Sequence, residues 1–205
     1  MAYFQDFSMI LGITGGFGCG KSSVLHFFES RSWFVLDADA VCRSFYDEKH
    51  PKLIDCIRNN FGDGVFSADG QIDRRELGKI LFDSPEKMSL ITGIIYPLLT
   101  ERIHEKIAEC REKKIHGAFE LPLLYEAGFE NCFDKILAVW CPAELRKKRL
   151  LGRNFSPDEV DRRDKMQLPP DEKLERADYG VINSGSFEEL ISQLSAVADK
   201  LEKYD

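Results

Sequence analysis

The hydrophobic pattern of the chain alternates between two periods, and this alternation predicts an α/β fold. Short apolar runs are separated by longer segments in which apolar residues recur every three or four positions. The runs predict buried strands of a parallel sheet, and the longer spacing predicts helices between them. The predicted strands cover residues 9–13, 33–36, 115–120, 135–140 and 181–182. We therefore expect a parallel five-stranded sheet with flanking helices.

Between the second and third predicted strands, a long stretch has helical spacing. Helices are predicted at 51–61, around 77–81, and from Pro97 onward, where a proline suits the first turn. Glycine-rich turns separate the first two, and residues 65–66 between those turns form a small strand or a turn. Such an insertion over the strand ends suits a substrate-binding domain, although spacing alone is equally compatible with a plain helical crossover.

The remaining helices are predicted in the rest of the chain, at 23–30, at 41–46, after the fourth strand and at the C-terminus. The last of these begins with a capping box formed by Ser186 and Glu189. An apolar stripe follows from Leu190 to Leu201, which predicts that this helix serves core packing.

A glycine-rich loop follows the first predicted strand. Residues 15–22 read Gly-Gly-Phe-Gly-Cys-Gly-Lys-Ser and match G-x-x-x-x-G-K-[ST], the phosphate-binding loop of nucleoside-triphosphate hydrolases and kinases. Its glycines allow backbone N–H groups to turn inward at a helix N-terminus and bind an anion. In this motif, Lys21 reaches the β- and γ-phosphates and the Ser22 hydroxyl ligates Mg²⁺. The sequence therefore predicts a nucleotide-binding protein.

Cys19 lies inside this loop, and two interpretations of its side chain are open. The converging N–H groups favour a thiolate, which would make a solvent-accessible Cys19 reactive. This interpretation predicts inactivation by a maleimide that MgATP slows. Alternatively, Cys19 stands in for a serine, with its side chain turned into the helix packing.

Acidic residues follow two of the predicted strands. Asp37 and Asp39 come after the second strand, and Glu120 ends the third. Ligands of open α/β sheets bind at the carboxyl ends of strands, so we expect these side chains beside the phosphate-binding loop. One aspartate could cap the next helix while the other orients and deprotonates a substrate hydroxyl. Glu120 holds the shell of a magnesium ion or is a chance strand-end acid.

A basic cluster follows the fourth predicted strand. The helix expected there carries Arg146, Arg149 and Arg153 on one face, together with two lysines. Only Glu144 balances these charges within the helix. In an acidic protein this imbalance favours an anion-binding lid over a merely solvated face. The next basic residues, within 162–165, alternate with acids and indicate a solvated helix.

Composition narrows the class of protein and its compartment. The chain has 205 residues and a formal net charge of −7, which argues against a general nucleic-acid binder. Its six cysteines include no C-x-x-C pair, so neither zinc nor a disulfide framework is suggested, and free thiols indicate a reducing cytoplasm.

No apolar run approaches the ~18 residues needed to cross a bilayer. Residues 1–8 lack the features of a signal peptide and predict a short extension ahead of the first strand.

Further motifs occur in a fixed order along the chain. Asp37-Ala38-Asp39 is followed by Arg43, and Asp73-Arg74 is followed by Leu77 and Phe82. Later come Pro122-Leu123-Leu124-Tyr125-Glu126, then Arg149, Arg153, Arg163 and Gln167, and finally Ala177-Asp178-Tyr179 with Asn183 and Gly185. Together with the glycine-rich loop, this set resembles the motifs of the dephospho-coenzyme A kinase family over nearly the whole chain. A phosphate-binding loop alone is shared by many families, but the ordered set is specific.

The resemblance implies a P-loop kinase fold with three parts. These are a core (about 9–46, 114–144 and 178–205), a helical substrate-binding insertion (about 47–113) and an Arg-rich lid (about 145–177). It also implies transfer of the γ-phosphoryl group of ATP, with Mg²⁺, to the ribose 3′-hydroxyl of dephospho-CoA, the last step of coenzyme A synthesis. The expected protein is a cytoplasmic monomer or weak homo-oligomer that binds neither nucleic acid nor membrane.

The resemblance further implies roles for individual residues. The catalytic residues are Lys21, Asp39 as the base, and Arg149 and Arg153 from the lid. ATP is expected to contact Gly16, Phe17, Gly18, Cys19, Gly20, Lys21, Ser22, Ser23 and, near the adenine, Asn183. The substrate is expected to contact Asp37, Asp39, Arg43, Arg74, Pro122 and Leu123. Magnesium is expected on Ser22, with Glu120 acting through water.

Four positions depart from the family pattern. Cys19 stands where the family commonly has Ser, and Glu120 stands where it has Asp. Tyr96 stands where His is usual, and Ile182 stands where Asp is common. None of these changes removes a charge that phosphoryl transfer obviously needs.

Three other functions compete with this interpretation. Another small-molecule or nucleoside-monophosphate kinase would share the loop and the lid. A guanine-nucleotide switch would need an N-K-x-D motif, which the sequence lacks. An inactive nucleotide-binding module would be expected to have lost Lys21 or the strand-end acids, which are present.

Overall fold

The computed structural model describes residues 7–82 and 84–203, which form two compact units. One unit comprises the described residues up to Asp37 and from Lys106 onward, and the other comprises Ala38–Glu105. Of the extension predicted over residues 1–8, the first six lie outside the described residues, and Phe7 and Ser8 precede the first strand. The division into core, substrate-binding insertion and lid assigns functions to parts of the chain, and it stays a prediction.

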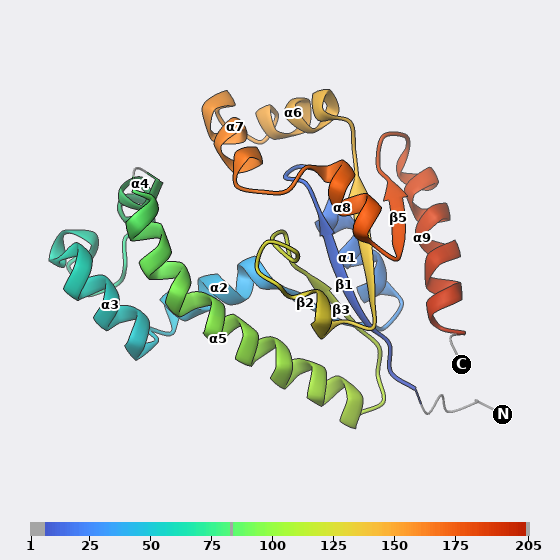
Figure 1. Cartoon of the computed structure of the whole chain (residues 1–205), viewed down its shortest axis with the longest axis horizontal. Helices are drawn as coiled ribbons and strands as arrows, with labels where there is room; N and C mark the ends of the chain where they lie inside the picture. Colours follow the sequence, from blue (N-terminus) through green and yellow to red (C-terminus); the bar gives the residue numbers. More distant parts are fainter. Residues whose placement is uncertain (1–6, 83, 204–205) are drawn as a thin grey trace. The chain divides into compact units, whose positions relative to one another are not determined.

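A five-stranded parallel sheet forms the centre of the first unit (Figure 1). The strands lie in the order β2-β3-β1-β4-β5. Their bounds are Ile10–Gly15 (β1), Phe34–Asp37 (β2), Gly117–Glu120 (β3), Lys135–Trp140 (β4) and Tyr179–Ile182 (β5). Every residue of the central strand β1 is buried, as the continuous apolar run indicated. The predicted sheet is confirmed.

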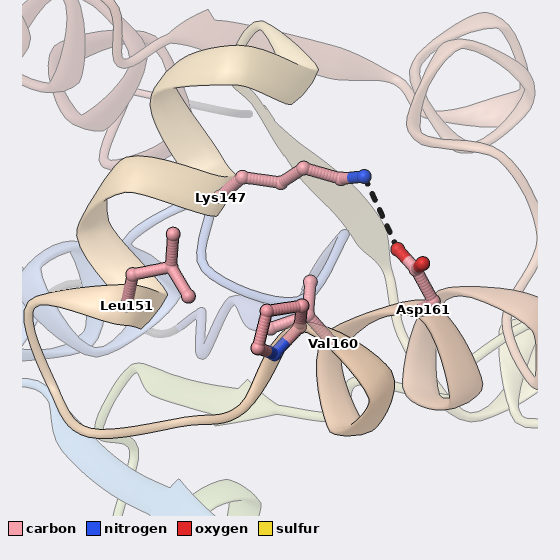
Figure 2. A pocket seen from close by; sticks show the side chains of 5 residues that line it. Lys147, Leu151, Val160 and Asp161 are labelled. Atoms are coloured by element: carbon pink, nitrogen blue, oxygen red, sulfur yellow. Dashed lines mark ion pairs between the residues drawn. The ribbon is translucent and has the colours of Figure 1, made fainter.

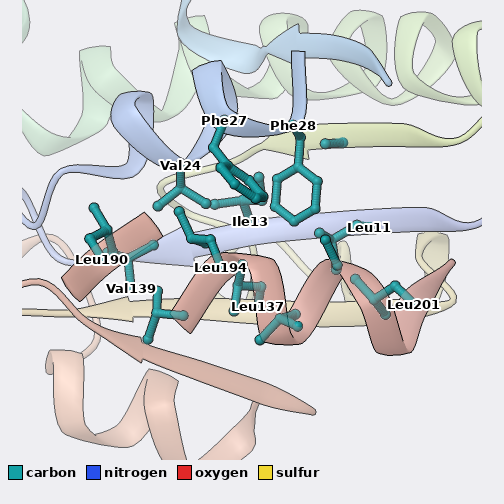
Figure 3. Close-up of a cluster of buried hydrophobic side chains, with 14 of the residues drawn as sticks. Leu11, Ile13, Val24, Phe27, Phe28, Leu137, Val139, Leu190, Leu194 and Leu201 are labelled. Atoms are coloured by element: carbon teal, nitrogen blue, oxygen red, sulfur yellow. The ribbon is translucent and has the colours of Figure 1, made fainter. Parts of the chain in front are cut away.

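Helices α1 and α9 form the main core with strands β1 and β4 (Figure 3). The helices of this unit are α1 (Lys21–Ser30), α6 (Ala143–Leu151), α7 (Pro157–Lys165), α8 (Pro170–Arg176) and α9 (Phe187–Leu201), with a 3₁₀ turn η2 (Glu130–Cys132). The apolar stripe predicted for the last helix is buried from Leu190 to Leu201, and it packs with Val24 and Phe28 of α1. This packing fixes α1, and therefore the loop that precedes it.

The second unit is helical, as the spacing predicted. Its elements are α2 (Ala38–Asp47), α3 (Pro51–Phe61), the 3₁₀ turn η1 (Asp63–Val65), α4 (Arg74–Phe82) and α5 (Pro85–Glu112), which continues into the first unit. Val65 ends the 3₁₀ turn, and Phe66 pairs with Ile72 in an isolated antiparallel bridge. Within residues 7–82 and 84–203, no helix has the length and apolar character needed to cross a membrane.

The predicted helix start at Pro97 is wrong, because Pro97 lies inside α5. A proline within a helix removes the hydrogen bond to the carbonyl oxygen four residues earlier, which here belongs to Gly93. Both residues are exposed, so water can solvate that carbonyl group. Buried residues recur every four positions along the helix, at Ile91, Ile95, Leu99 and Ile103. Their packing stabilises one continuous helix across the proline.

Candidate active site at the end of strand β1

The loop between β1 and α1 has a backbone conformation that favours glycine. Gly15 and Gly20 have φ values of 147° and 93°. A Cβ atom on Gly15 would lie 2.3 Å from the carbonyl oxygen of Val139, and one on Gly20 would lie 2.2 Å from Nδ2 of Asn183. The backbone conformation and the lack of space both require glycine at these two positions of the motif.

Helix α1 begins without a side-chain cap. Its N-cap residue is Gly20, and its first turn contains no acidic residue. The first four N–H groups of a helix have no partner within the helix, and the helix dipole adds partial positive charge at this end. The start of α1 is therefore suited to bind an anion, as the motif predicted.

Lys21 places its ammonium group beside the loop. The residue is 7% exposed, and Nζ donates hydrogen bonds to the carbonyl oxygens of Gly15 (3.1 Å) and Gly16 (3.2 Å). An ammonium group has three donors, and residues of the described chain accept two of them. The third donor is available to a phosphate oxygen held by the loop.

Oxygen ligands suitable for magnesium lie at the start of α1 and at the ends of two strands. Ser22 is exposed in the first turn of α1. Glu120 is buried at the end of β3, in register with Asp37 at the end of β2. Mg²⁺ keeps several water ligands and commonly takes few protein ligands plus phosphate oxygens, so this donor set fits it. Among the described residues, no group of three or more His, Cys, Asp or Glu side chains could hold a metal by itself.

A pocket of about 230 Å³ lies beside the loop. The predicted nucleotide-binding and catalytic residues that line it are Gly18, Gly20, Ser23, Arg149, Arg153 and Asn183. Gly185, Phe187 and Leu190 complete the lining. These three residues are not among the ligand contacts predicted from the sequence. Their position directly after the last strand, where ligands of parallel sheets bind, is the signal that could have identified them.

Asn183 joins the glycine-rich loop to α6. Its Nδ2 donates a hydrogen bond to the carbonyl oxygen of Cys19 (2.8 Å), and its Oδ1 accepts one from Nη2 of Arg149 (3.3 Å). Its backbone N–H donates to the carbonyl oxygen of Trp140 (2.8 Å), at the end of β4. The side-chain amide therefore has protein partners at both its nitrogen and its oxygen.

The basic cluster of α6 is more balanced than the sequence indicated. Buried Arg146 donates to both carboxylate oxygens of Asp164 on α7, at 2.8 and 3.1 Å. Lys147 pairs with Asp161 of α7 at 3.1 Å, beside a small cavity of about 40 Å³ (Figure 2). Glu144 is the only acid within α6, as the sequence shows, but Asp161 and Asp164 of the next helix compensate two of its basic residues.

Arg149 and Arg153 nevertheless lie at the pocket. Helix α6 ends at Leu151, so Arg153 lies beyond it and the predicted single helical face of three arginines is wrong. Besides its bond to Asn183, Arg149 lies 3.4 Å from Sγ of Cys141. Within the part of the chain that the structure describes, neither arginine pairs with a carboxylate. Their charge is therefore available to an anionic ligand in the pocket.

Two other arginines attach the segment 145–177 to the loop. Nη1 of Arg146 donates to the carbonyl oxygen of Phe17 (3.0 Å). The guanidinium of Arg163 lies 4.7 Å from the ring centre of Phe17 and 5.3 Å from that of Phe155, within the range of cation–π attraction. Phe17 is a predicted ATP contact, and through it Arg146 and Arg163 attach the segment 145–177 to the loop.

A fully buried lysine was not predicted. Lys173 on α8 is 0% exposed, and its Nζ donates to the carbonyl oxygen of Pro122 (2.5 Å) and pairs with Glu126 (2.8 Å). Burial lowers the pKa of Lys173, and the hydrogen bond to Glu126 opposes that shift. These contacts fix the turn that carries the predicted substrate residues Pro122 and Leu123. The sequence around Lys173 is acidic and gives no sign that the residue is buried.

The reactive interpretation of Cys19 is wrong. The side chain is 0% exposed and belongs to the hydrophobic core. Burial raises the pKa of the thiol, and the opposing charges of Lys21 and Arg146 do not overcome this effect. Cys19 therefore contributes to the loop through its backbone, while its sulfur atom packs against the core.

Three predicted substrate residues belong to the second unit. Asp39 and Arg43 are exposed on α2, and Arg74 is exposed at the start of α4, where it lies 3.7 Å from Asp47. Helix α2 follows β2 without an intervening loop, so Asp39 comes two residues after the strand ends. The participation of these residues in one site with the glycine-rich loop stays a prediction.

The glycine-rich loop joins the central strand of a parallel sheet to an uncapped helix, which is the arrangement that defines P-loop proteins. The fold is that of the P-loop kinases. A shikimate kinase from Aquifex aeolicus has a similar fold, with a TM-score of 0.50 and 16% identity, over 93% of this chain and 96% of that chain.

The chain belongs to the dephospho-CoA kinase family. Residues 9–189 match the sequence profile of dephospho-CoA kinase. A dephospho-CoA kinase from Aquifex aeolicus is 37% identical over 94% of this chain and 97% of that protein. The crystal structure of TT1252 from Thermus thermophilus has a TM-score of 0.78 and 31% identity, over 95% of this chain and 98% of that chain. The resemblance inferred from the ordered motifs is therefore confirmed.

Proposed function

We propose that the protein transfers the γ-phosphoryl group of ATP to the ribose 3′-hydroxyl of dephospho-CoA, giving coenzyme A and ADP. The observation that carries the proposal is the pocket beside the β1–α1 loop in a member of this family. An uncapped helix start and two arginines contribute to its lining, and Lys21 lies beside the same loop. Phosphoryl transfer depends on positioning and on neutralising charge, which these groups can supply.

The loop and Lys21 hold the triphosphate in this proposal. Backbone N–H groups of residues 16–23 and the third donor of Lys21 bind phosphate oxygens. Ser22 ligates Mg²⁺, with Glu120 acting through water. When bound, Mg²⁺ neutralises charge on the phosphate oxygens.

Arg149 and Arg153 act on the phosphoryl group during transfer. Both line the pocket beside the loop. Guanidinium groups form strong hydrogen bonds with phosphate and stabilise the charge that spreads over the equatorial oxygens. The segment 145–177 that carries them is the proposed lid, and residues 47–113 form the proposed substrate-binding part.

Asp39 is the proposed base. It accepts the proton of the 3′-hydroxyl as that oxygen bonds to the γ-phosphorus. The bond between the γ-phosphorus and the bridging oxygen breaks, and ADP leaves with the electron pair. The remaining proposed contacts of dephospho-CoA are Asp37, Arg43, Arg74, Pro122 and Leu123.

The proposed setting is the cytoplasm, where the protein acts as a monomer or weak homo-oligomer on a small molecule rather than on a nucleic acid. Two features of the sequence support this: its net charge of −7 and its cysteines without a disulfide-like pattern.

A coupled assay of ADP release tests the function, with dephospho-CoA compared against adenosine, AMP and shikimate. We expect turnover with dephospho-CoA and a product whose mass equals that of coenzyme A. Asp39→Asn should keep ATP binding while kcat falls by about 10²–10⁴-fold. Preferred turnover of another acceptor would overturn the function, and near-normal turnover of the variant would remove Asp39 as the base.

A further inference from the structure

Phe187, the first residue of α9, presents an aromatic ring at the nucleotide pocket. It is 63% exposed, more than any other large hydrophobic residue among those the structure describes. It lines the pocket together with Gly185, Leu190, Arg149 and loop residues. Water covering so much apolar surface is unfavourable, so a ligand that replaces this water gains affinity.

The helical period explains why Phe187 is not part of the core. Phe187 and Leu190 lie three positions apart and therefore share one face of α9. Leu190 is 2% exposed and lies near one end of the core cluster, close to Val139 and Val24 (Figure 3). Phe187 extends the apolar stripe by one turn beyond that cluster, which places it at the pocket.

The start of α9 is held in one conformation. The Ser186 hydroxyl oxygen accepts a hydrogen bond from the N–H of Glu189 (3.2 Å), and Glu189 Oε2 accepts one from the N–H of Ser186 (3.1 Å). A Cβ atom on Gly185 would lie 1.7 Å from Glu189 Oε2, so the glycine makes room for this capping box. Phe187 therefore stands on a rigid element rather than on a mobile loop tip.

The lining of the pocket changes character from α1 to α9. The loop end offers an uncapped helix start for phosphate groups, whereas the first turn of α9 contains Glu188 and Glu189 and disfavours anions. When the phosphates of a nucleoside triphosphate occupy the loop, its uncharged base is the part of the molecule that suits the α9 end of the pocket. The amide of Asn183 already has protein partners at its nitrogen and at its oxygen. The main contact that the α9 end of the pocket offers a base is therefore the aromatic face of Phe187.

We propose that Phe187 is the platform on which the nucleobase of the phosphate donor stacks, and thus a residue that determines donor affinity. This rests on the proposed function, in which the donor is ATP. Aromatic side chains bind bases by stacking without reading their edges. Phe187 accordingly contributes to the affinity for any purine nucleoside triphosphate. It contributes nothing to the affinity for a polyphosphate that has no base.

Calorimetric titration of the full chain with MgATP, MgGTP and magnesium tripolyphosphate tests this, without any second substrate. For Phe187→Ala we expect affinity for both nucleotides to fall by about five- to fifty-fold, with tripolyphosphate affinity unchanged. Phe187→Trp should keep nucleotide affinity. Phe7→Ala is the matched control, because Phe7 is also an exposed phenylalanine (38%) and does not line the pocket. A thermal unfolding scan of each variant confirms that it is folded.

Two results would overturn the proposal. Equal loss of nucleotide and tripolyphosphate affinity would mean that Phe187 only shapes the loop, and unchanged nucleotide affinity would mean that the base does not contact it. The kinase assay separates this proposal from the proposed function. Base-dependent binding that needs Phe187, in a protein that does not phosphorylate dephospho-CoA, would support the platform and refute the proposed function.

Discussion

Helices α1 and α9 both begin at the same pocket, yet their N-termini are built in opposite ways. Helix α1 has Gly20 as its N-cap residue, with no side-chain cap and no acid in its first turn. Helix α9 has Ser186 as its N-cap residue, with a complete capping box and two glutamates in its first turn. The first helix therefore has N–H groups and partial positive charge for a ligand. In the second, the capping box occupies the N–H groups of Ser186 and Glu189, and the two glutamates repel anions.

This difference shows how one pocket can bind the two chemically different ends of a nucleotide. A helix N-terminus whose N–H groups are left without side-chain partners can bind phosphate through them. Where the protein caps it, the same element can offer an apolar side chain instead, as α9 does with Phe187. If the two helix starts have separate tasks, a change at one of them should leave the task of the other unaltered.

Ser22→Asp gives α1 the acidic first turn that α9 has. We expect kcat/KM for MgATP to fall by about 10³-fold, because the carboxylate repels phosphate and the hydroxyl ligand is lost. Steady-state kinetics measure this, with Ser22→Thr as the matched control that the motif allows. The control should remain active. If Ser22→Asp kept more than about a tenth of wild-type activity, α1 would not be the phosphate site.

Gly20→Ala adds a Cβ atom 2.2 Å from Nδ2 of Asn183, at a φ of 93°. We expect MgATP affinity to fall by about ten- to hundred-fold, because the loop must shift and the bond from Asn183 to Cys19 is broken. The double variant with Asn183→Ala removes the clash. The fold-loss of MgATP affinity in the double variant should be smaller than the product of the fold-losses in the two single variants, because the effects of substitutions at residues in contact are not independent. Strictly multiplicative losses would contradict the steric explanation.

Ser186→Ala removes the cap of α9 without touching α1. The free energy of unfolding should fall by about 1 kcal/mol, which lowers the melting temperature by roughly 2–4 °C in a chain of this size. Tripolyphosphate affinity should not change, because α9 contributes nothing to the phosphate end. Ser156→Ala at the start of α7 is the matched control, since Ser156 also caps its helix and lies outside the pocket. Loss of tripolyphosphate affinity in Ser186→Ala alone would show that the two helix starts are not independent.

The smallest effect is expected at Cys19, between the glycines of the α1 loop. Its thiol is buried and its pKa is raised by that burial, so a maleimide should leave Cys19 unmodified in the folded protein. Cys19→Ser should keep near-normal activity, because the loop uses the backbone of this residue. Peptide mass mapping after brief labelling measures the modification. Rapid labelling of Cys19 that MgATP slows would restore the reactive interpretation.

The sheet and the glycine-rich loop were predictable because their signals are local. A buried parallel strand is a continuous apolar run, and the loop is a short motif between a strand and a helix. The continuous α5 was not predictable in the same way. Whether Pro97 starts or interrupts a helix depends on whether Gly93 is exposed and on the buried stripe packed against that helix.

The details of the site that were wrong or missed depend on tertiary contacts. Arg146 is neutralised by Asp164 from the next helix, and spacing within α6 cannot show this. The direction of the Cys19 side chain follows from the core behind the loop. The exposure of Phe187 depends on where the core ends, because the apolar stripe of α9 continues through it without a break.

The central position of β1 has a consequence for how the protein is made. Its partners β3 and β4 lie more than 100 residues later, with Ile10 beside Gly117 and Leu11 beside Lys135. At about 5–20 residues per second, the ribosome needs roughly 6–25 s after β1 to complete β4. Until β3 is made, the fully buried strand β1 has neither neighbour, and β4 follows later. The glycine-rich loop also lacks Asn183, which is synthesised after both strands. A nascent chain that stops before residue 183 should therefore bind no nucleotide and should depend on a chaperone to shield β1.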